Sequence, residues 1–373
     1  MNKVIIYFPY PLKIANTGSS VRPNKMLEAF REYTTNHGLE LIEIYGESIE
    51  RKEKVEKFIK SINPKEILFC YMENSTLPYW LTDKDHIPRT PFLELLLFRY
   101  FKKNNIPLGI FYRDVYWLFD EEYSLKGIKK SVMRAIYRLE KNIYKKFANK
   151  IFLPSNDMNE YLDFPVSIVS SLPPGSEKRF LPNINNKTNT LNIIYVGAIS
   201  EKMGLSNMLK AVKIVNESNV RCKLLLICRL EDYNLYKKDL LQLEKLNLVE
   251  VRQAFGQELY ALYENADIAI IPREKNVYND FAVPVKLFEY LSFGLPVVST
   301  DNNAVTNIIQ EGPYGIIVKS NPEDLSNAII KLNCQELRTK IKNNISRDIP
   351  NKHLWINRVE KIFNDLCTTK RVK

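Results

Sequence analysis

The sequence predicts an α/β protein built from two domains, each with a parallel sheet. Its 373 residues, 45% of them hydrophobic, are roughly two to three times the length of a typical single-core domain. Short runs rich in β-branched and aromatic residues alternate with longer amphipathic segments. The short runs are apolar on both faces, as parallel strands need when helices cover each side of the sheet.

The first half carries one complete series of alternating elements. The β-rich runs predict strands, and the longer segments between them show helical spacing of apolar residues. We expect strands at residues 4–8, 39–45, 67–71, 108–112 and 150–153, and helices at 21–37, 52–62, 92–103 and about 124–147.

Turn-rich sequence separates this series from a second one. Residues 172–175 (LPPG) and 182–189 (PNINNKTN) are rich in proline and asparagine, so we place the interdomain linker there. The domains are expected at 1–175 and 176–351, and a helix at 352–366 has a broad apolar face that should pack back on the first domain. The second series predicts strands at 191–196, 223–227, 249–254, 268–271, 296–299 and 315–318.

Composition excludes several classes of protein. With 26% charged and 11% aromatic residues the chain is neither disordered nor fibrous. Five cysteines without CxxC spacing and three distant histidines argue against a disulfide framework and a protein-bound metal, and they favour a reducing compartment. No stretch approaches the roughly 20 apolar residues that span a bilayer, so we expect a soluble protein or one attached to a membrane surface.

Two strand-to-helix turns are suited to bind an anion. Gly18 precedes a helix whose first turn holds Arg22, and free helix amides beside an arginine favour phosphate. The second half repeats the design with Gly197, Lys202 and Gly204 after a strand. Each segment also fits an ordinary turn or a solvated lysine. The GxGxxG spacing is missing, so a nicotinamide or flavin site is not supported.

The most informative segment is residues 284–293. Pro284 is expected at the first helical position, with Lys286 in the first turn, so the helix N-terminus should attract a diphosphate. Glu289, about one turn further on, is placed to accept hydrogen bonds from ribose hydroxyls. The alternative is a surface carboxylate on a helix.

These motifs resemble retaining, nucleotide-sugar-dependent glycosyltransferases of the GT-B fold, especially glycosyltransferase family four. Within that family the chain is most similar to bacterial surface-polysaccharide transferases. The resemblance rests on PVKLFEYLSFGLPVVST (284–300), YVGAIS (195–200) with Lys202, ELYALYENADIAIIP (258–272), LPPG (172–175), the helix around Trp355, RPNKMLEAF (22–30) and FYRDVYW (111–117).

The resemblance implies two Rossmann-like domains facing a cleft, the first binding an acceptor and the second a nucleotide-diphosphate sugar. It places Glu289 on the ribose and Lys202 near the diphosphate, with no bound cofactor. It also gives the donor-binding set Gly18, Gly197, Lys202, Arg273, Asp280, Val285, Lys286 and Glu289.

Two positions depart from the family pattern. The first glutamate of the family's pair is replaced by Phe281, so either the adjacent Asp280 substitutes for it or the sugar is held differently. The arginine expected after the YVG strand is Ala198, and either Lys286 or Arg273 would supply the missing charge.

A charged and aromatic cluster follows the strand at 108–112. The carboxyl ends of strands line the crevice of α/β sheets, and relatives place a His-Asp pair here, which Asp114 matches in part; an ion pair in the cleft wall is the alternative. The acceptor-binding set is Arg22, Arg113, Asp114 and Tyr116, and the catalytic set is Asp114, Lys202 and Lys286.

The helix within residues 125–150 holds nine basic residues and one acidic residue, with apolar residues interleaved. A basic amphipathic helix suits an anionic membrane surface, although the apolar stripe equally fits a core-facing role. Nucleic acid is disfavoured, because no helix-turn-helix, zinc-finger or RNA-binding signature accompanies the charge. The expected membrane-surface residues are Lys129, Lys130, Arg134, Arg138, Lys141 and Lys145.

The predicted function is transfer of a sugar from a nucleotide-diphosphate sugar to a saccharide or polyprenyl-linked saccharide, with retention and without metal, in bacterial surface-polysaccharide synthesis. The protein is expected in the cytoplasm, peripheral to the inner face of the cell membrane. Two alternatives stay open: a sugar-nucleotide epimerase or hydrolase, and a non-catalytic partner subunit.

Overall fold

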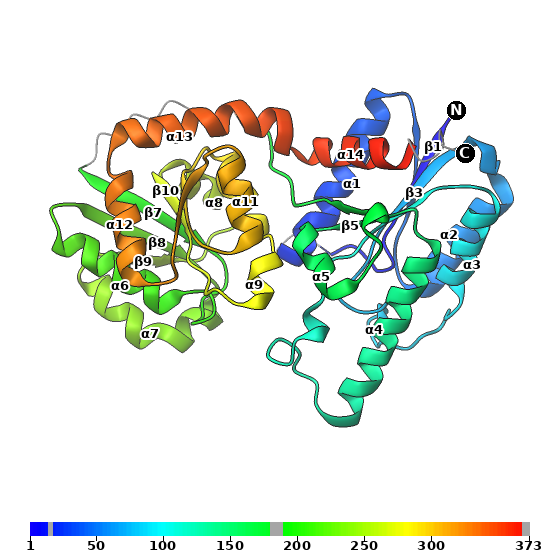
Figure 1. Cartoon of the computed structure of the whole chain (residues 1–373), viewed down its shortest axis with the longest axis horizontal. Coiled ribbons are helices and arrows are strands. Elements are labelled where there is room, and N and C mark those ends of the chain that lie inside the picture. Colours follow the sequence, from blue (N-terminus) through cyan, green and yellow to red (C-terminus); the bar gives the residue numbers. More distant parts are fainter. Residues whose placement is uncertain (14–17, 180–188, 368–373) are drawn as a thin grey trace. The chain divides into compact units, whose positions relative to one another are not determined.

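The computed structural model describes residues 1–13, 18–179 and 189–367 (Figure 1). The chain forms two compact units. The first comprises Met1–Pro174 together with Trp355–Lys373, and the second comprises Gly175–Leu354. Most of the predicted linker segment 182–189 lies outside the described residues.

The first unit holds a six-stranded sheet in the order β2-β1-β3-β4-β5-β6 with parallel pairing throughout. The chain leaves β1 for β2 on one side and then adds β3 on the other, so the strand order reverses at β1 and β3. The short edge strand β6 is not predicted from the sequence. The strands are β1 (Lys3–Tyr7), β2 (Glu40–Ile44), β3 (Ile67–Glu73), β4 (Leu108–Phe111), β5 (Lys150–Leu153) and β6 (Val169–Ser171).

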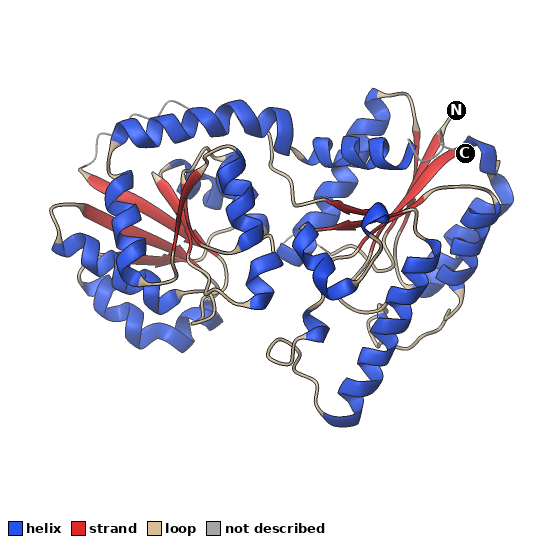
Figure 2. Ribbon diagram, viewed as in Figure 1, coloured by secondary structure: helices blue, strands red, loops and turns tan. Residues whose placement is uncertain are grey.

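Helices cover both faces of this sheet (Figure 2). The helices α1 (Gly18–Asn36) and α14 (Trp355–Cys367) pack together and contribute to one apolar cluster, with Phe30 and Phe363 among its buried residues. In Figure 1 α4 runs beside α3, with which it is in contact. The other helices of the unit are α2 (Ser48–Ser61), α3 (Leu93–Lys103), α4 (Gly127–Phe147) and α5 (Asn159–Leu162).

The second unit holds another six-stranded parallel sheet, in the order β12-β11-β10-β7-β8-β9. Its strand order reverses between β7 and β10, the two central strands. Two sheets of this kind confirm the predicted α/β fold class. The strands are β7 (Thr190–Val196), β8 (Arg221–Ile227), β9 (Val249–Arg252), β10 (Ile268–Ile271), β11 (Val297–Thr300) and β12 (Gly315–Val318).

A single large apolar cluster fills this unit, with residues from the strands and from most of the surrounding helices. The strands β10 and β11 are buried along their whole length, which explains why they read as continuous apolar runs. The helices are α6 (Leu205–Glu217), α7 (Leu230–Lys245), α8 (Gly256–Glu264), α9 (Val277–Phe281), α10 (Val285–Ser292), α11 (Asn303–Glu311), α12 (Pro322–Leu332) and α13 (Gln335–Asp348).

Candidate functional site

The carboxyl edge of the second sheet brings two of the predicted donor residues, Gly197 and Arg273, onto neighbouring strand ends. Gly197 directly follows β7, and Arg273 comes two residues after β10. These strands are paired neighbours at the point where the strand order reverses. Ligands of open α/β sheets bind outside the carboxyl ends of strands at such a switch point.

The turn that carries Lys202 is fastened to the segment after β10. Gly204 has φ +78°, and a Cβ there would lie 1.7 Å from the carbonyl oxygen of Pro272, so only glycine permits this approach. The backbone N–H of Glu274 donates to the carbonyl of Lys202 at 3.2 Å. The Lys202 side chain itself is exposed.

The guanidinium of Arg273 has no hydrogen bond or ion pair with any residue that the structure describes. The side chain is half-buried, and burial lowers its pKa, although Tyr195, Tyr278 and Tyr290 nearby act in the opposite direction. Its carbonyl, in contrast, is fixed, since Thr300 Oγ1 and Asn302 Nδ2 both donate to it. A buried cation without a carboxylate partner is costly, so this position favours an anionic ligand.

The helix α10 carries Lys286 and Glu289 on one side. Lys286 Nζ lies 2.6 Å from Glu289 Oε2, and Tyr263 OH donates to the same oxygen at 3.0 Å. Both contacts use Oε2, and Oε1 makes no hydrogen bond to the described part of the chain. The prediction that Pro284 is the first helical residue is wrong. Pro284 is the N-cap of α10, with ψ 137°, and Val285 is the first helical residue.

The residues expected to meet the donor sugar are engaged elsewhere. Phe281 is 3% exposed and belongs to the interior of the unit. Asp280 Oδ1 accepts a hydrogen bond at 3.2 Å from the backbone N–H of Asn303, the first residue of α11, and Lys275 Nζ lies 3.8 Å from the same oxygen. Asp280 therefore satisfies a free amide at the N-terminus of α11.

The first unit gathers its own polar cluster at the carboxyl ends of β1, β3 and β4. Glu73, the last residue of β3, is fully buried and lies between two arginines. Arg22 Nε donates to Glu73 Oε2 at 3.3 Å, and Arg113 Nη2 donates to Glu73 Oε1 at 2.9 Å and to Tyr10 OH at 2.8 Å. Gly18 opens α1 one turn before Arg22.

Glu73 and Tyr10 are not among the site residues predicted from the sequence. The strand that Glu73 ends is an apolar run followed by Glu73 and Asn74, and Asn74 Oδ1 accepts from the backbone N–H of Arg113 at 2.8 Å. The same rule that singled out Arg113, a polar residue at the carboxyl end of a buried strand, would have found Glu73.

Asp114 and Tyr116 shape the turn after β4. Asp114 Oδ1 accepts from the backbone N–H of Tyr116 at 3.0 Å, which forms an Asx turn. The Tyr116 hydroxyl lies 2.8 Å from the Tyr137 hydroxyl on α4. Arg113 pairs with Glu73 in the sheet, as described above.

The basic helix α4 presents three of its aliphatic residues to solvent. Ile128, Val132 and Leu139 are 84%, 53% and 54% exposed, whereas Tyr137, Glu140 and Tyr144 face the core. The possibility that the whole apolar stripe faces the core is therefore wrong for these three residues. Of the predicted membrane-surface residues, Lys130 and Arg134 pair with Asp120, Lys145 donates to the Asp163 carbonyl, and Lys129, Arg138 and Lys141 make no ion pair with a described residue.

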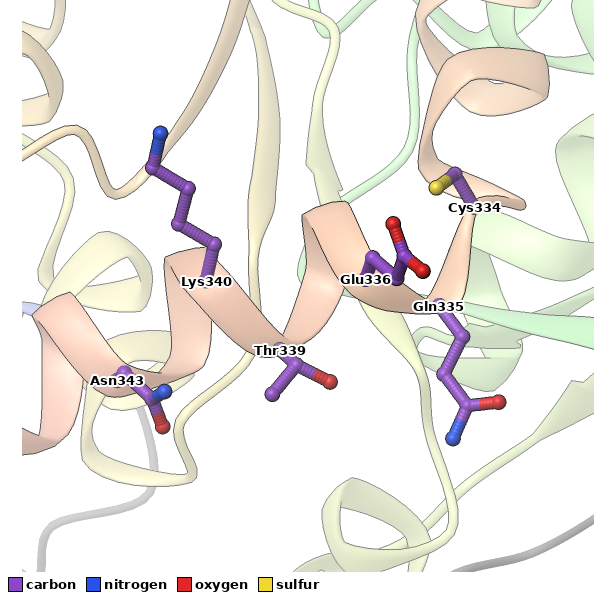
Figure 3. A pocket seen from close by; sticks show the side chains of 6 residues that line it. All are labelled: Cys334, Gln335, Glu336, Thr339, Lys340 and Asn343. Atoms are coloured by element: carbon purple, nitrogen blue, oxygen red, sulfur yellow. The ribbon is translucent and has the colours of Figure 1, made fainter.

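Two hollows on the described surface of the second unit are lined by none of the predicted site residues. One runs along a single side of α13 and its preceding residue (Figure 3). A second is lined by residues of β12, α11 and α12, together with Asp301. The residues that line the first are Cys334, Gln335, Glu336, Thr339, Lys340 and Asn343.

Within residues 1–13, 18–179 and 189–367, no three His, Cys, Asp or Glu side chains lie together as metal ligands would. No described helix combines the length and the apolar character that crossing a bilayer requires.

The second unit also has a recognisable sequence. Residues 177–348 match the family described as Glycosyl transferases group 1. This segment is a group 1 glycosyl transferase domain. The glycosyl transferase domain contains Gly197, Lys202, Arg273, Lys286 and Glu289.

Two curated bacterial proteins are similar to part of the chain. WcaL of Escherichia coli strain K12, whose name gives it as a glycosyltransferase of colanic acid biosynthesis, is 27% identical over 150 residues, 38% of this chain and 36% of that protein. TuaH of Bacillus subtilis strain 168, named for teichuronic acid biosynthesis, is 30% identical over 104 residues, 27% of this chain and 26% of that protein. The matches thus span about a quarter to a third of these relatives.

Solved structures match almost the whole chain. Sucrose-phosphate synthase of Thermosynechococcus elongatus has a TM-score of 0.63 at 14% identity, covering 99% of this chain and 100% of that one. HepE of Anabaena, solved in complex with UDP, has a TM-score of 0.62 at 12% identity, with 99% and 100% covered. WaaG, a glycosyltransferase of lipopolysaccharide biosynthesis, has a TM-score of 0.58 at 14% identity, with 97% and 99% covered. The fold of the chain is therefore that of GT-B glycosyltransferases.

Proposed function

We propose that the protein is a retaining glycosyltransferase that moves a sugar from a nucleotide-diphosphate sugar to a saccharide or lipid-linked saccharide in bacterial surface-polysaccharide synthesis. One observation carries the proposal. Inside the segment that matches group 1 glycosyl transferases, Arg273, which has no hydrogen-bond or ion-pair partner among the described residues, follows β10, and a Lys-Glu pair lies on α10. This arrangement offers positive charge to a diphosphate and a carboxylate oxygen to a ribose.

The proposed reaction depends mainly on electrostatic stabilisation of the charges that develop in the transition state. Breaking the bond between sugar and phosphate builds negative charge on the leaving diphosphate and positive charge on the sugar. Arg273, Lys202 and the amino end of α10 stabilise the leaving group, because preorganised charges and dipoles need no rearrangement as the reaction proceeds. Lys286 acts beside Glu289 and orients its carboxylate. The resemblance further implies attack from the face that the nucleotide leaves, with the departing phosphate accepting the acceptor's proton.

The first unit supplies the acceptor site in this proposal. Asp114 and Tyr116 follow β4, and Arg22 and Arg113 lie beside them at the same edge of the sheet. The relatives' names, which refer to colanic and teichuronic acid biosynthesis, support a saccharide acceptor of the cell surface. Asp114 orients the acceptor hydroxyl or the transferred sugar.

Helix α4 is the proposed contact with an anionic membrane at the cytoplasmic face. Its outer face combines exposed Ile128, Val132 and Leu139 with Lys129 and Arg138 on the flanks. Aliphatic residues that would otherwise contact water gain from insertion between lipids, and each nearby basic residue adds about 1 kcal/mol on an anionic surface. A lipid-linked acceptor would be found on such a surface.

A non-catalytic role has one observation in its favour. The position of the family's first glutamate is the buried Phe281, and the adjacent Asp280 caps α11. Phe281 offers no carboxylate to the donor sugar, and Asp280 Oδ1 is engaged by the amide of Asn303. A partner subunit without turnover would bind the nucleotide and release nothing, which makes turnover the property to measure.

The test measures nucleotide release by purified protein with a panel of nucleotide sugars and a lipid-linked acceptor. We expect release that depends on acceptor, together with an elongated saccharide that keeps the anomeric configuration of the donor. Free sugar or epimerised nucleotide without acceptor would support a hydrolase or epimerase instead. Tight nucleotide binding without release across the panel would support the non-catalytic subunit.

A further inference from the structure

We infer that Arg22, with Glu73 and Arg113, forms a subsite for one phosphoryl group in the first unit, and that its ligand is the phosphate of a lipid-linked saccharide acceptor. The inference rests on the proposed function, since it names the acceptor's chemistry. It is built from residues of α1, β3 and the segment after β4.

The cluster lies where a ligand of this sheet is expected. Tyr10 follows β1, and Glu73 ends β3, the two paired strands at which the strand order reverses. Arg113 follows β4, the next strand. Switch points of open α/β sheets form a crevice outside the carboxyl ends of the strands, and ligands bind there.

The charges of the cluster do not balance. Two guanidinium groups share a single buried carboxylate, because Arg22 Nε and Arg113 Nη2 bond to the two oxygens of Glu73 at 3.3 and 2.9 Å. The three side chains together therefore carry one positive charge. A phosphodiester, or one phosphorus of a pyrophosphate linkage to a lipid, carries one negative charge and would neutralise it.

Arg22 is the member of the cluster whose terminal N–H groups lack hydrogen-bond partners among the described residues. It is 5% exposed, and its Nη1 and Nη2 are buried without a hydrogen-bond partner in the described part of the chain. Its guanidinium carbon lies 3.6 Å from the centroid of the Phe111 ring and 5.9 Å from that of Trp355, and neither ring accepts the two in-plane N–H groups as an oxygen would. Two parallel N–H groups match the oxygens of a phosphate.

A purely structural arginine would behave differently. If Arg22 served only to stabilise the fold, its replacement by methionine would lower the melting temperature and leave phosphate binding unchanged. In a ligand site, removal of the surplus charge leaves Arg113 and Glu73 as a balanced pair. The methionine variant should then be at least as stable without ligand, and a phosphate ligand should no longer raise its melting temperature.

The experiment titrates full-length protein with two probes, farnesyl diphosphate in detergent and inorganic pyrophosphate. It is done in a Lys286→Ala/Glu289→Ala background, which weakens binding in the second unit. Arg22→Met is expected to weaken probe binding at least about tenfold, the effect of losing a charged hydrogen bond. The matched control is Arg31→Met on the same helix, whose 53% exposed guanidinium pairs with Glu43, and it should bind as the parent does.

A second variant should change probe affinity in the opposite direction. Glu73→Gln leaves two positive charges without the carboxylate, so the folded variant should bind the probes more tightly than the parent. Tighter binding of farnesyl diphosphate than of pyrophosphate would identify a lipid-linked phosphate as the ligand, and equal binding would identify a free phosphate at the same site. Unchanged probe affinity in Arg22→Met would overturn the inference and would not bear on the proposed sugar transfer. If the unmodified protein bound no nucleotide, the proposed sugar transfer alone would be refuted.

Discussion

Lys286 Nζ and Glu289 Oε2 lie 2.6 Å apart, one turn from each other on α10. This ion pair partly neutralises the lysine, so Lys286 positions the carboxylate more than it attracts a diphosphate. Arg273 has no such partner among the described residues, and its guanidinium follows the neighbouring strand β10. In the proposed donor site, we therefore expect Arg273 to contribute more positive charge than Lys286 does.

Replacing Arg273 by methionine should change stability and binding in opposite directions. Burial lowers the pKa of this guanidinium, so removing its charge is expected to stabilise the protein without ligand by about 1 kcal/mol. Affinity for nucleoside diphosphates should fall at least about tenfold, because a charged hydrogen bond is lost. Thermal unfolding and calorimetric titration measure the two effects. Arg252→Met is the control, since that arginine pairs with Glu250 on the edge strand β9. A loss of both stability and affinity in Arg273→Met would contradict the proposed role of Arg273.

Glu140 should make the stability of the first unit depend on pH. Burial raises the pKa of this carboxyl to about 8, although the Tyr79 backbone N–H and the Tyr144 hydroxyl donate to it at 2.8 and 3.0 Å. The folded state thus holds a proton that the unfolded state releases near pH 4.3, so stability falls as the pH rises from about 4.3 to about 8.

Glu140→Gln removes this dependence. The variant should match the parent near pH 4 and exceed it by a few kcal/mol, as an order of magnitude, at pH 9. Urea unfolding across this pH range provides the measurement. Equal stabilities of variant and parent at pH 9 would show that Glu140 is not held as the neutral acid.

The outer face of α4 should bind anionic vesicles. Ile128→Ser with Leu139→Ser removes two exposed aliphatic side chains, each worth about 1.5–3 kcal/mol if fully buried in lipid, so vesicle affinity should fall at least about tenfold. Stability should change by less than about 0.5 kcal/mol per site, because neither side chain packs in the core. Co-sedimentation with phosphatidylglycerol vesicles tests this. Leu235→Ser on α7, where the side chain is 79% exposed, is the control, and an equal loss in that variant would argue against α4.

The sequence predicts the buried strands well because they are apolar on both faces. Ile268–Ile271, buried at every position, has the predicted bounds, since an apolar run and its flanking turns suffice to define a buried parallel strand. Gly315–Val318, a partly buried edge strand, also has the predicted bounds. The edge strand Val169–Ser171 has two serines among its three residues, so it offers no apolar run to find.

The contacts of the candidate site depend on pairings that local pattern does not contain. Glu73 meets Arg22 and Arg113 only because three strands end at one edge of the sheet. Asp280 reaches the amide of Asn303 across 23 positions of sequence. Such partners follow from strand order, which periodicity does not reveal.

The orientation of α4 shows a second reason why the sequence pattern does not predict every contact. Its core face is lined by Tyr137, Glu140 and Tyr144, which a hydropathy pattern reads as polar. Hydrogen bonds within the unit satisfy the carboxyl and hydroxyl groups and permit their burial. The aliphatic residues are consequently left on the outer face.

The most direct test of the donor site compares a nucleoside diphosphate with its 2′,3′-dideoxy analogue in the parent and in Glu289→Ala. The account predicts that the parent prefers the ribonucleotide by about tenfold or more and that the variant shows little preference, because the ribose hydroxyls have lost their acceptor. A variant that keeps the full preference would contradict the placement of the ribose on Glu289 and, with it, the proposed donor site.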